Sequence, residues 1–120
     1  MTTALGYETL TLDEVKSLTS NDVAGLCYQY GVSVEDSGAH LDEYYQSNAR
    51  SIRDGGPSVY GHFWTKVGEV EAILKTSDQW PFPPLTVREN TLYDGHHRAN
   101  AAIKAGWDKE IPVTEQFMWW

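Results

Sequence analysis

The stretch Leu92-Tyr-Asp-Gly-His-His-Arg-Ala-Asn-Ala-Ala-Ile-Lys-Ala-Gly106 carries the strongest structural signal in the chain. Its apolar residues recur at the spacing of one helix face, and Gly106 is the residue type that commonly ends a helix. Upstream, the apolar runs 85–87 and 91–93 flank the turn-forming pair Glu89-Asn90, as in a β-hairpin. We therefore predict adjacent strands over 84–87 and 91–94, and then a helix over 96–105 packed through Ala99, Ala102 and Ile103.

The rest of the chain supplies further strands and helices around this segment. Alternation over Glu8–Leu12 and the run Ile111-Pro-Val113 predict two more strands. Helical spacing of apolar residues predicts a turn of helix after a cap at Asp13, and helices within 22–30, 41–53 and 67–74. Ser, Asp and Gly over 33–39 predict a loop. The expected fold class is α/β.

Length and charge limit the possible functions. A chain of 120 residues predicts a single domain over 1–120. With 9 basic against 17 acidic residues, the net charge of -8 argues against nonspecific binding of duplex DNA, which requires a basic face. A small anionic ligand needs only a few donors. No apolar run is long enough for a membrane span, no signal peptide is evident, and Cys27 has no partner cysteine, so we expect a cytoplasmic protein without membrane partners.

The junction at Asp94-Gly95 is the candidate ligand site. Backbone amides at a helix start can face an anion, and Gly95 lets a ligand approach the backbone closely. Helix first turns favour acids, yet this one carries His96, His97 and Arg98. The pattern predicts a bound phosphate. In the alternative interpretation Asp94 only caps the helix, and the three side chains point into water.

These residues, together with Ile111-Pro-Val113, resemble the ParB/sulfiredoxin superfamily. The resemblance covers about residues 67–113, and also 10–15 at the start. It implies a single small mixed β-sheet with packed helices, and a nucleotide-phosphate pocket formed by Gly95, His96, His97 and Arg98. The activities it suggests are phosphoryl transfer and phosphodiester hydrolysis, as in an NTPase, kinase or nuclease, with Asp94 or His96 as the catalytic proton-transfer group.

Two departures narrow what the resemblance implies. Sulfiredoxin has a cysteine where this chain has His96, so sulfinic-acid reduction is excluded. ParB's DNA-binding domain follows the motif, and only seven residues follow Val113 here, which excludes a DNA-loading clamp. The segment Ser51-Ile-Arg-Asp-Gly-Gly-Pro57 resembles another phosphate-contacting segment of ParB, but it lies about thirty residues too early in the chain. Arg50 and Arg53 are additional candidates for the pocket, although we favour the account in which they are surface arginines that complement the helix dipole.

Metals and partners follow from the same residues. Adjacent histidines diverge on a helix, so we expect no protein-only metal site, whereas Mg²⁺ could accompany a bound nucleotide. The expected ligand is a nucleotide or another phosphorylated small molecule. Trp119 and Trp120, at the end of the chain, are candidates for a homodimer contact or a protein partner.

Two functions remain open at this point. The first is a nucleotide- or phosphate-binding domain, in which Arg98→Ala would weaken binding about tenfold and leave the stability of the free protein nearly unchanged. The second is a small acidic interaction protein without catalysis, for example one encoded by a phage that engages a host factor. The net charge of -8 and the aromatic C-terminus favour the second, whereas the intact Gly95-His-His-Arg98 favours the first, which is our main prediction.

Overall fold

The computed structural model describes residues 3–4, 7–21, 31–47 and 62–115. Its strands form one mixed sheet of six strands, in the order β1-β2-β6-β4-β5-β3. The elements are β1 (Thr3–Ala4), β2 (Tyr7–Leu10), α1 (Leu12–Lys16), β3 (Thr19–Ser20), α3 (Val34–Ser47), α5 (His62–Lys75), β4 (Leu85–Arg88), β5 (Thr91–Asp94), α6 (His96–Ala105) and β6 (Ile111–Thr114). The predicted α/β class with a single mixed sheet is confirmed.

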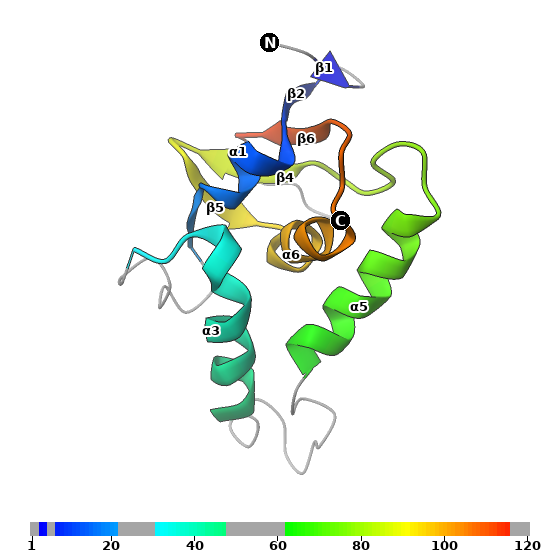
Figure 1. The fold of residues 1–120 in the computed structure, drawn as a ribbon. Coiled ribbons are helices and arrows are strands. Elements are labelled where there is room, and N and C mark those ends of the chain that lie inside the picture. Colours follow the sequence, from blue (N-terminus) through cyan, green and yellow to red (C-terminus); the bar gives the residue numbers. More distant parts are fainter. Residues whose placement is uncertain (1–2, 5–6, 22–30, 48–61, 116–120) are drawn as a thin grey trace.

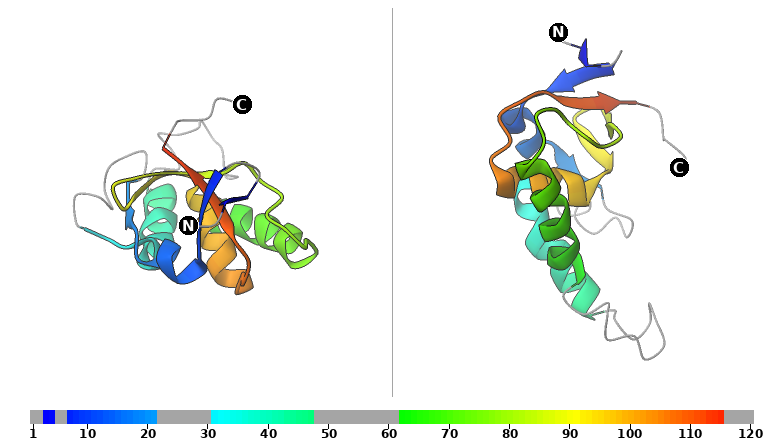
Figure 2. Two further views of the ribbon diagram at one scale, coloured as in Figure 1. Left: turned by 90° about the horizontal axis from the view of Figure 1, so that it is seen from above. Right: turned by 90° about the vertical axis from the view of Figure 1, so that its right-hand side faces the viewer.

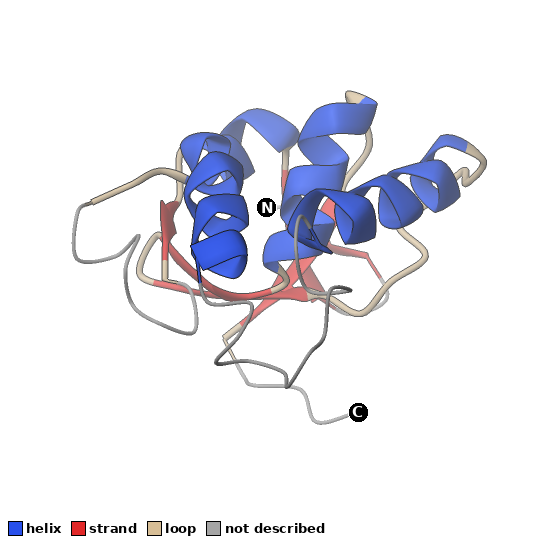
Figure 3. Ribbon diagram, turned by 90° about the horizontal axis from the view of Figure 1, so that it is seen from below, coloured by secondary structure: helices blue, strands red, loops and turns tan. Residues whose placement is uncertain are grey.

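The sheet and the helices form two layers. The helices lie on one face of the sheet, and α6 occupies the centre of that layer (Figures 1, 2 and 3). Ala99, Ala101 and Ala102 on α6 are fully buried. Because alanine side chains are small, α6 can approach both the sheet and the neighbouring α5 closely. The core is completed by large side chains such as Phe63, Leu85 and Ile111, which are also fully buried.

The β4–β5 hairpin confirms the prediction for residues 84–94. The two strands are antiparallel, and Glu89 and Asn90 connect them with φ angles of 48° and 65°. Two consecutive positive φ values are typical of the type I′ turn, whose twist matches that of the flanking strands. β6 then lies parallel to β4, so that α6 carries the chain across the sheet from β5 to the far side of β4.

The predicted helix over 96–105 is also confirmed, and Gly106 ends it. Gly106 has φ 64°, and its amide donates to the carbonyls of Ala102 and Ile103. Near the N-terminus of the chain the prediction was wrong in one detail. The cap of α1 is Thr11 rather than Asp13, because the Thr11 hydroxyl accepts from the Glu14 amide while the Glu14 carboxylate accepts from the Thr11 amide. Such a reciprocal pair satisfies two backbone donors at once.

The predicted loop over 33–39 was wrong. α3 begins at Val34 and includes Gly38, where a Cβ atom would clash with the Trp64 ring and lie 2.8 Å from Asn100 Oδ1. Glycine is therefore present because α3 packs tightly against α5 and α6, and not because the chain turns there. The short β3 and the first turn of α5, from His62, were not predicted. The predicted helix within 22–30 lies outside the described residues, as does the part of 41–53 beyond Ser47.

No helix in the described parts of the chain combines the length and the apolar character that a membrane span requires.

Candidate functional site

The start of α6 is built on Gly95. Gly95 is the N-cap residue with φ 101°, and no side chain accepts a hydrogen bond at this cap. A Cβ atom at this position would lie 2.5 Å from Leu85 Cδ2 and 3.1 Å from one Arg98 nitrogen. Glycine is thus required twice, by the positive φ and by the closeness of a core leucine. The position that a Cβ atom would take at Gly95 is filled by the side chains of Leu85 and Arg98.

Arg98 is turned toward the interior of the protein. Its Nη1 donates to the carbonyl oxygen of Pro83 at 2.7 Å, and its Nη2 lies 3.7 Å from the Asp94 carboxylate. Only 16% of its side chain is exposed, against 49% for Asp94. Burial lowers the pKa of Arg98, and the nearby Asp94 carboxylate opposes this shift. An arginine nevertheless stays charged at any physiological pH, so Arg98 acts here as a permanent donor.

The segment that Arg98 contacts explains why an arginine is needed. Trp80-Pro-Phe-Pro-Pro84 contains three prolines, which lack an amide donor and keep the segment out of regular structure. Its carbonyls still require donors when they are buried. The Pro83 carbonyl accepts one hydrogen bond from the Trp80 indole at 3.1 Å and a second from Arg98. Arg98 therefore holds the segment leading into β4 against the start of α6.

The two histidines of the motif also face neighbouring elements. The His97 ring lies 4.8 Å from the Phe63 ring of α5, measured between centroids, and both histidines are only partly exposed. The His96 carbonyl accepts from Asn100, whose amide also donates to Ser37 of α3. The motif thus ties α6 to α3, to α5 and to the segment before β4.

The structure brings together the predicted residues from Asp94 to Arg98, but it does not leave their side chains in water. The simple alternative, in which Asp94 caps the helix, was wrong, because the cap is Gly95. Phosphate binding by Gly95, His96, His97 and Arg98, and catalysis by Asp94 or His96, stay predictions. Arg50, Arg53, Cys27, Trp119 and Trp120 lie outside the described residues. Within the described residues, no group of three or more His, Cys, Asp or Glu side chains is placed to hold a metal ion.

A different region, beside α1, forms a hollow of about 640 Å³ that we call the α1 groove. Its apolar lining residues, which we call the floor, are Leu10 on β2, Val113 on β6, Val87 on β4 and Leu18 after α1. Leu10 and Val87 are partly exposed, whereas Val113 and Leu18 are nearly buried. Four exposed carboxylates line the groove around this floor: Glu8, Glu14, Glu89 and Glu115. The remaining lining residues are Ser17, Asn90 and Thr114.

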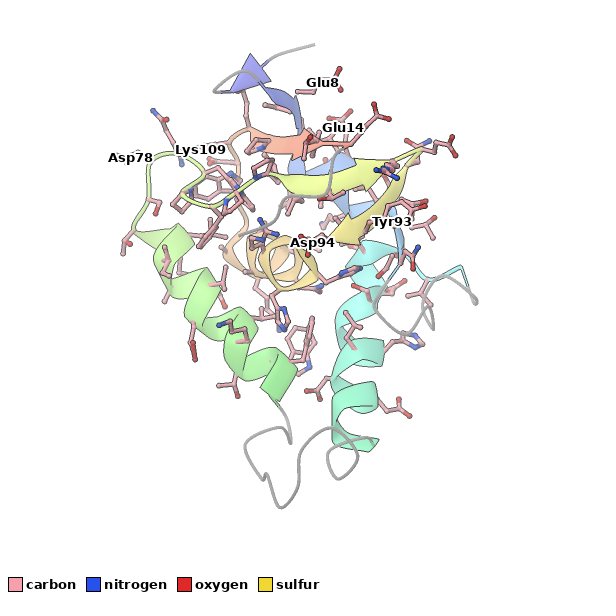
Figure 4. The ribbon with its side chains drawn as sticks, turned by 180° about the vertical axis from the view of Figure 1, so that it is seen from behind. Glu8, Glu14, Asp78, Tyr93, Asp94 and Lys109 are labelled. Carbon is pink, nitrogen blue, oxygen red and sulfur yellow. The ribbon has the colours of Figure 1, made fainter. Side chains whose placement is uncertain are left out.

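The groove is well separated from the α6 start. Figure 4 shows Glu8 and Glu14 beside β2 and β6, whereas Asp94 lies where β5 leads into α6. Glu8, Glu89 and Glu115 take part in none of the ion pairs found within the described residues; those pairs use Glu35, Glu71, Asp94 and Asp108. The nearby Arg88 donates from its Nε to the backbone carbonyl of Glu115 at 2.6 Å and so adds one positive charge beside these acids. With four carboxylates against this one cation, the rim keeps an excess of negative charge.

A second hollow, of about 720 Å³, shares Leu10 and Glu14 with the α1 groove and extends to Trp107. It also has acidic residues, but Lys109 lies within it. The Lys109 ammonium is 3.3 Å from Asp108 and 4.8 Å from the centre of the Trp107 ring. This pairing neutralises part of the local charge, so the second hollow is less distinctive than the α1 groove.

Sequence reasoning missed the α1 groove for a clear reason. Its lining comes from four short segments that lie between Glu8 and Glu115, and none of them contains a motif. The only signal in the sequence was the overall net charge of -8. The hairpin turn Glu89-Asn90 was predicted as structure, but its contribution to a charged rim becomes visible only once β4 is known to lie beside β6.

The fold and its two candidate regions define a small acidic α/β protein with a structured α6 junction and an acid-rimmed groove. The chain belongs to the family of the Mycobacterium phage L5 gene 81 protein, whose family model matches residues 1–120. The gene 81 protein of Mycobacterium phage L5 itself is 50% identical over 117 residues, which cover 96% of this chain and 99% of that protein. No solved structure matches the chain.

This membership corrects the family assigned from the motif. The resemblance to the ParB/sulfiredoxin superfamily rested on about residues 67–113, whereas the gene 81 family accounts for the whole chain. The assignment to ParB/sulfiredoxin was wrong. The pattern that suggested it, a strand, a glycine and a helix with an arginine in its first turn, has a structural explanation here in the contacts of Gly95 and Arg98.

Proposed function

We propose that this protein is a phage-encoded interaction protein that binds a basic protein partner inside the infected cell and catalyses no reaction. The observation that carries this proposal is the unbalanced negative charge around the α1 groove. Glu8, Glu89 and Glu115 are exposed, and no ion pair among the described residues neutralises them. Complementary charge accelerates association and selects partners, which suits a small protein that must find one target in a cell.

Two further observations support binding rather than chemistry. The cationic side chain of the sequence motif, Arg98, donates a hydrogen bond to the Pro83 carbonyl and forms an ion pair with Asp94. A phosphate would therefore have to compete with contacts inside the protein. The family is a phage family, as the model match and the 50% identical relative establish. A protein partner of the host or of the phage is therefore the natural ligand class, and we place the encounter in the cytoplasm.

The test is a capture experiment followed by reconstitution. The tagged full-length chain is exposed to a mycobacterial lysate at low and at moderate salt, and each captured protein is then purified and titrated calorimetrically. We expect at least one purified partner with a basic surface to bind at micromolar or tighter affinity. Its affinity should fall between about 50 and 300 mM salt, because screening weakens attraction between exposed charges. Hydrolysis of a nucleoside triphosphate by the isolated protein would contradict the proposal.

A second candidate function is the binding of a phosphate at Gly95, His96, His97 and Arg98. One observation favours it: the N-cap of α6 has no side-chain acceptor, and the first turn contains no acid. Backbone amides at a helix start attract anions. Thermal-shift measurements with sulfate, ATP and ATP with Mg²⁺ test this candidate, since a ligand that binds only the folded state raises the melting temperature. An unchanged melting temperature up to millimolar concentrations would exclude it.

A further inference from the structure

The α1 groove has the form of a binding site for an extended peptide. Its apolar floor follows Leu10, Val113 and Val87 across neighbouring strands, and carboxylates stand on its rim. Its volume of about 640 Å³ lies within the roughly 300 to 1,000 Å³ of typical ligand pockets. An apolar floor with a charged rim resembles the usual anatomy of a protein interface, in which buried apolar contacts lie inside a polar margin.

We infer that the α1 groove binds a short segment of a partner protein in which apolar side chains alternate with lysine or arginine. Apolar side chains of the segment contact Leu10, Val87 and Val113, and its cations pair with Glu8, Glu89 and Glu115. This inference rests on the proposed function and adds the location of the site and the chemistry of the partner.

Charge distinguishes this occupant from the other candidates. A second copy of the same acidic chain would bring like charges together, and a nucleic acid or phosphorylated ligand would be repelled by the rim. The second hollow is a weaker candidate because Lys109 already occupies its acidic side. A basic segment with apolar side chains can make apolar contacts with the floor and also pair its cations with the carboxylates of the rim.

Glu89 and Glu14 hold fixed positions on this rim. Glu89 is in the left-handed region with φ 48°, as the hairpin turn requires, and the turn thereby places it beside the groove. The Glu14 carboxylate accepts a hydrogen bond from the Thr11 amide at 2.8 Å and so is also part of the cap of α1. For this reason Glu14 is left unchanged in the variants used to test the site.

The test compares two triple variants with the same change in charge. Glu8→Gln/Glu89→Gln/Glu115→Gln neutralises the rim, whereas Glu43→Gln/Glu69→Gln/Asp78→Asn neutralises three exposed acids on α3, on α5 and after α5. The probe is the end-capped peptide Lys-Leu-Lys-Leu-Lys, titrated by calorimetry. We expect the rim variant to bind roughly tenfold more weakly than wild type, and the matched variant to change affinity less than about twofold. Equal losses in both variants would mean that net charge alone attracts the peptide, which would overturn the inference.

Two control peptides test the floor and the sign of the charge. Lys-Ser-Lys-Ser-Lys should bind at least about tenfold more weakly, because it leaves the apolar floor uncovered. Glu-Leu-Glu-Leu-Glu should not bind. If the serine peptide binds as well as the leucine peptide, the floor is not used and the inference fails.

The purified partner from the capture experiment separates this inference from the proposed function. If the partner binds the wild type and the matched variant but no longer binds the rim variant, both the proposed function and the inference about the α1 groove are supported. If it binds all three equally, the protein is still an interaction protein, but the α1 groove is not its site. If no basic partner binds the wild type, the proposed function fails together with the inference.

Discussion

The start of α6 and the α1 groove both contain charged side chains, but they place them in opposite ways. At α6, Arg98 is directed inward to the Pro83 carbonyl, and only 16% of its side chain is exposed. In the groove, Glu8, Glu89 and Glu115 are exposed around an apolar floor. Arg98 makes contacts within the fold, whereas the rim acids make no ion pair within the described residues. For this reason we propose the groove, and not the conspicuous motif, as the binding surface.

The largest expected effect is at Gly95. Gly95→Ala should destabilise the protein by about 3 kcal/mol, because alanine is disfavoured at φ 101° and its Cβ would clash with Leu85. The melting temperature should fall by roughly 10 °C or more. Thermal unfolding followed by circular dichroism measures this change.

Gly68 provides the control for that substitution. It lies within α5, and a Cβ atom there would meet no atom within 4 Å. Gly68→Ala should therefore be neutral or stabilise the protein by up to about 1 kcal/mol, the difference in helix propensity. Similar melting temperatures for the two variants would contradict the tight packing assigned to Gly95.

Arg98→Ala should give the next largest effect. The change removes a charge-assisted hydrogen bond to a carbonyl in a segment with few donors, so we expect a loss of roughly 1.5 to 3 kcal/mol. Asp94→Asn should cost less than about 0.5 kcal/mol, since the Asp94 side chain is half exposed and 3.7 Å from Arg98. Chemical denaturation measures both changes. A stable Arg98→Ala protein would show that the arginine is available for a ligand.

Arg98 shows where sequence reasoning reached its limit. The sequence predicted that Arg98→Ala would leave stability nearly unchanged, because a cation in a first helical turn opposes the helix dipole. The structure leads us to expect a loss of stability instead, since the arginine donates to the carbonyl of Pro83, 15 residues earlier in the chain. The hairpin and α6 were predicted because turns and caps are set by neighbouring residues. Gly38 was misread as part of a loop, and the contacts of Arg98 were not foreseen, because the residues that Gly38 and Arg98 contact lie far from them in sequence.

A smaller effect of opposite sign is expected at Glu89. This residue has φ 48°, which non-glycine residues rarely adopt, so Glu89→Gly should stabilise the hairpin by about 0.5 to 1 kcal/mol. The same change removes a carboxylate from the rim of the α1 groove and should weaken peptide binding. Denaturation and titration of one variant measure both properties. If Glu89→Gly stabilises the protein but binds the peptide as tightly as the wild type, Glu89 is not part of the binding site.

The smallest effect is expected from the rim variant Glu8→Gln/Glu89→Gln/Glu115→Gln. These exposed side chains take part in no ion pair within the described residues, so stability should change by less than about 0.5 kcal/mol. Denaturation alongside the wild type checks this value. A large loss would mean that the carboxylates belong to the fold, as Arg98 does, and the contrast between the two regions would disappear.

The most direct test of that contrast is amide chemical-shift mapping of the wild-type protein. One sample is titrated with ATP and Mg²⁺, and a second with the peptide Lys-Leu-Lys-Leu-Lys. We predict that ATP leaves the amides of Gly95, His96 and His97 unchanged, and that the peptide shifts those of Leu10, Val87 and Asn90. Saturable shifts at Gly95 to His97 with ATP, together with an unperturbed α1 groove in the presence of the peptide, would contradict the account.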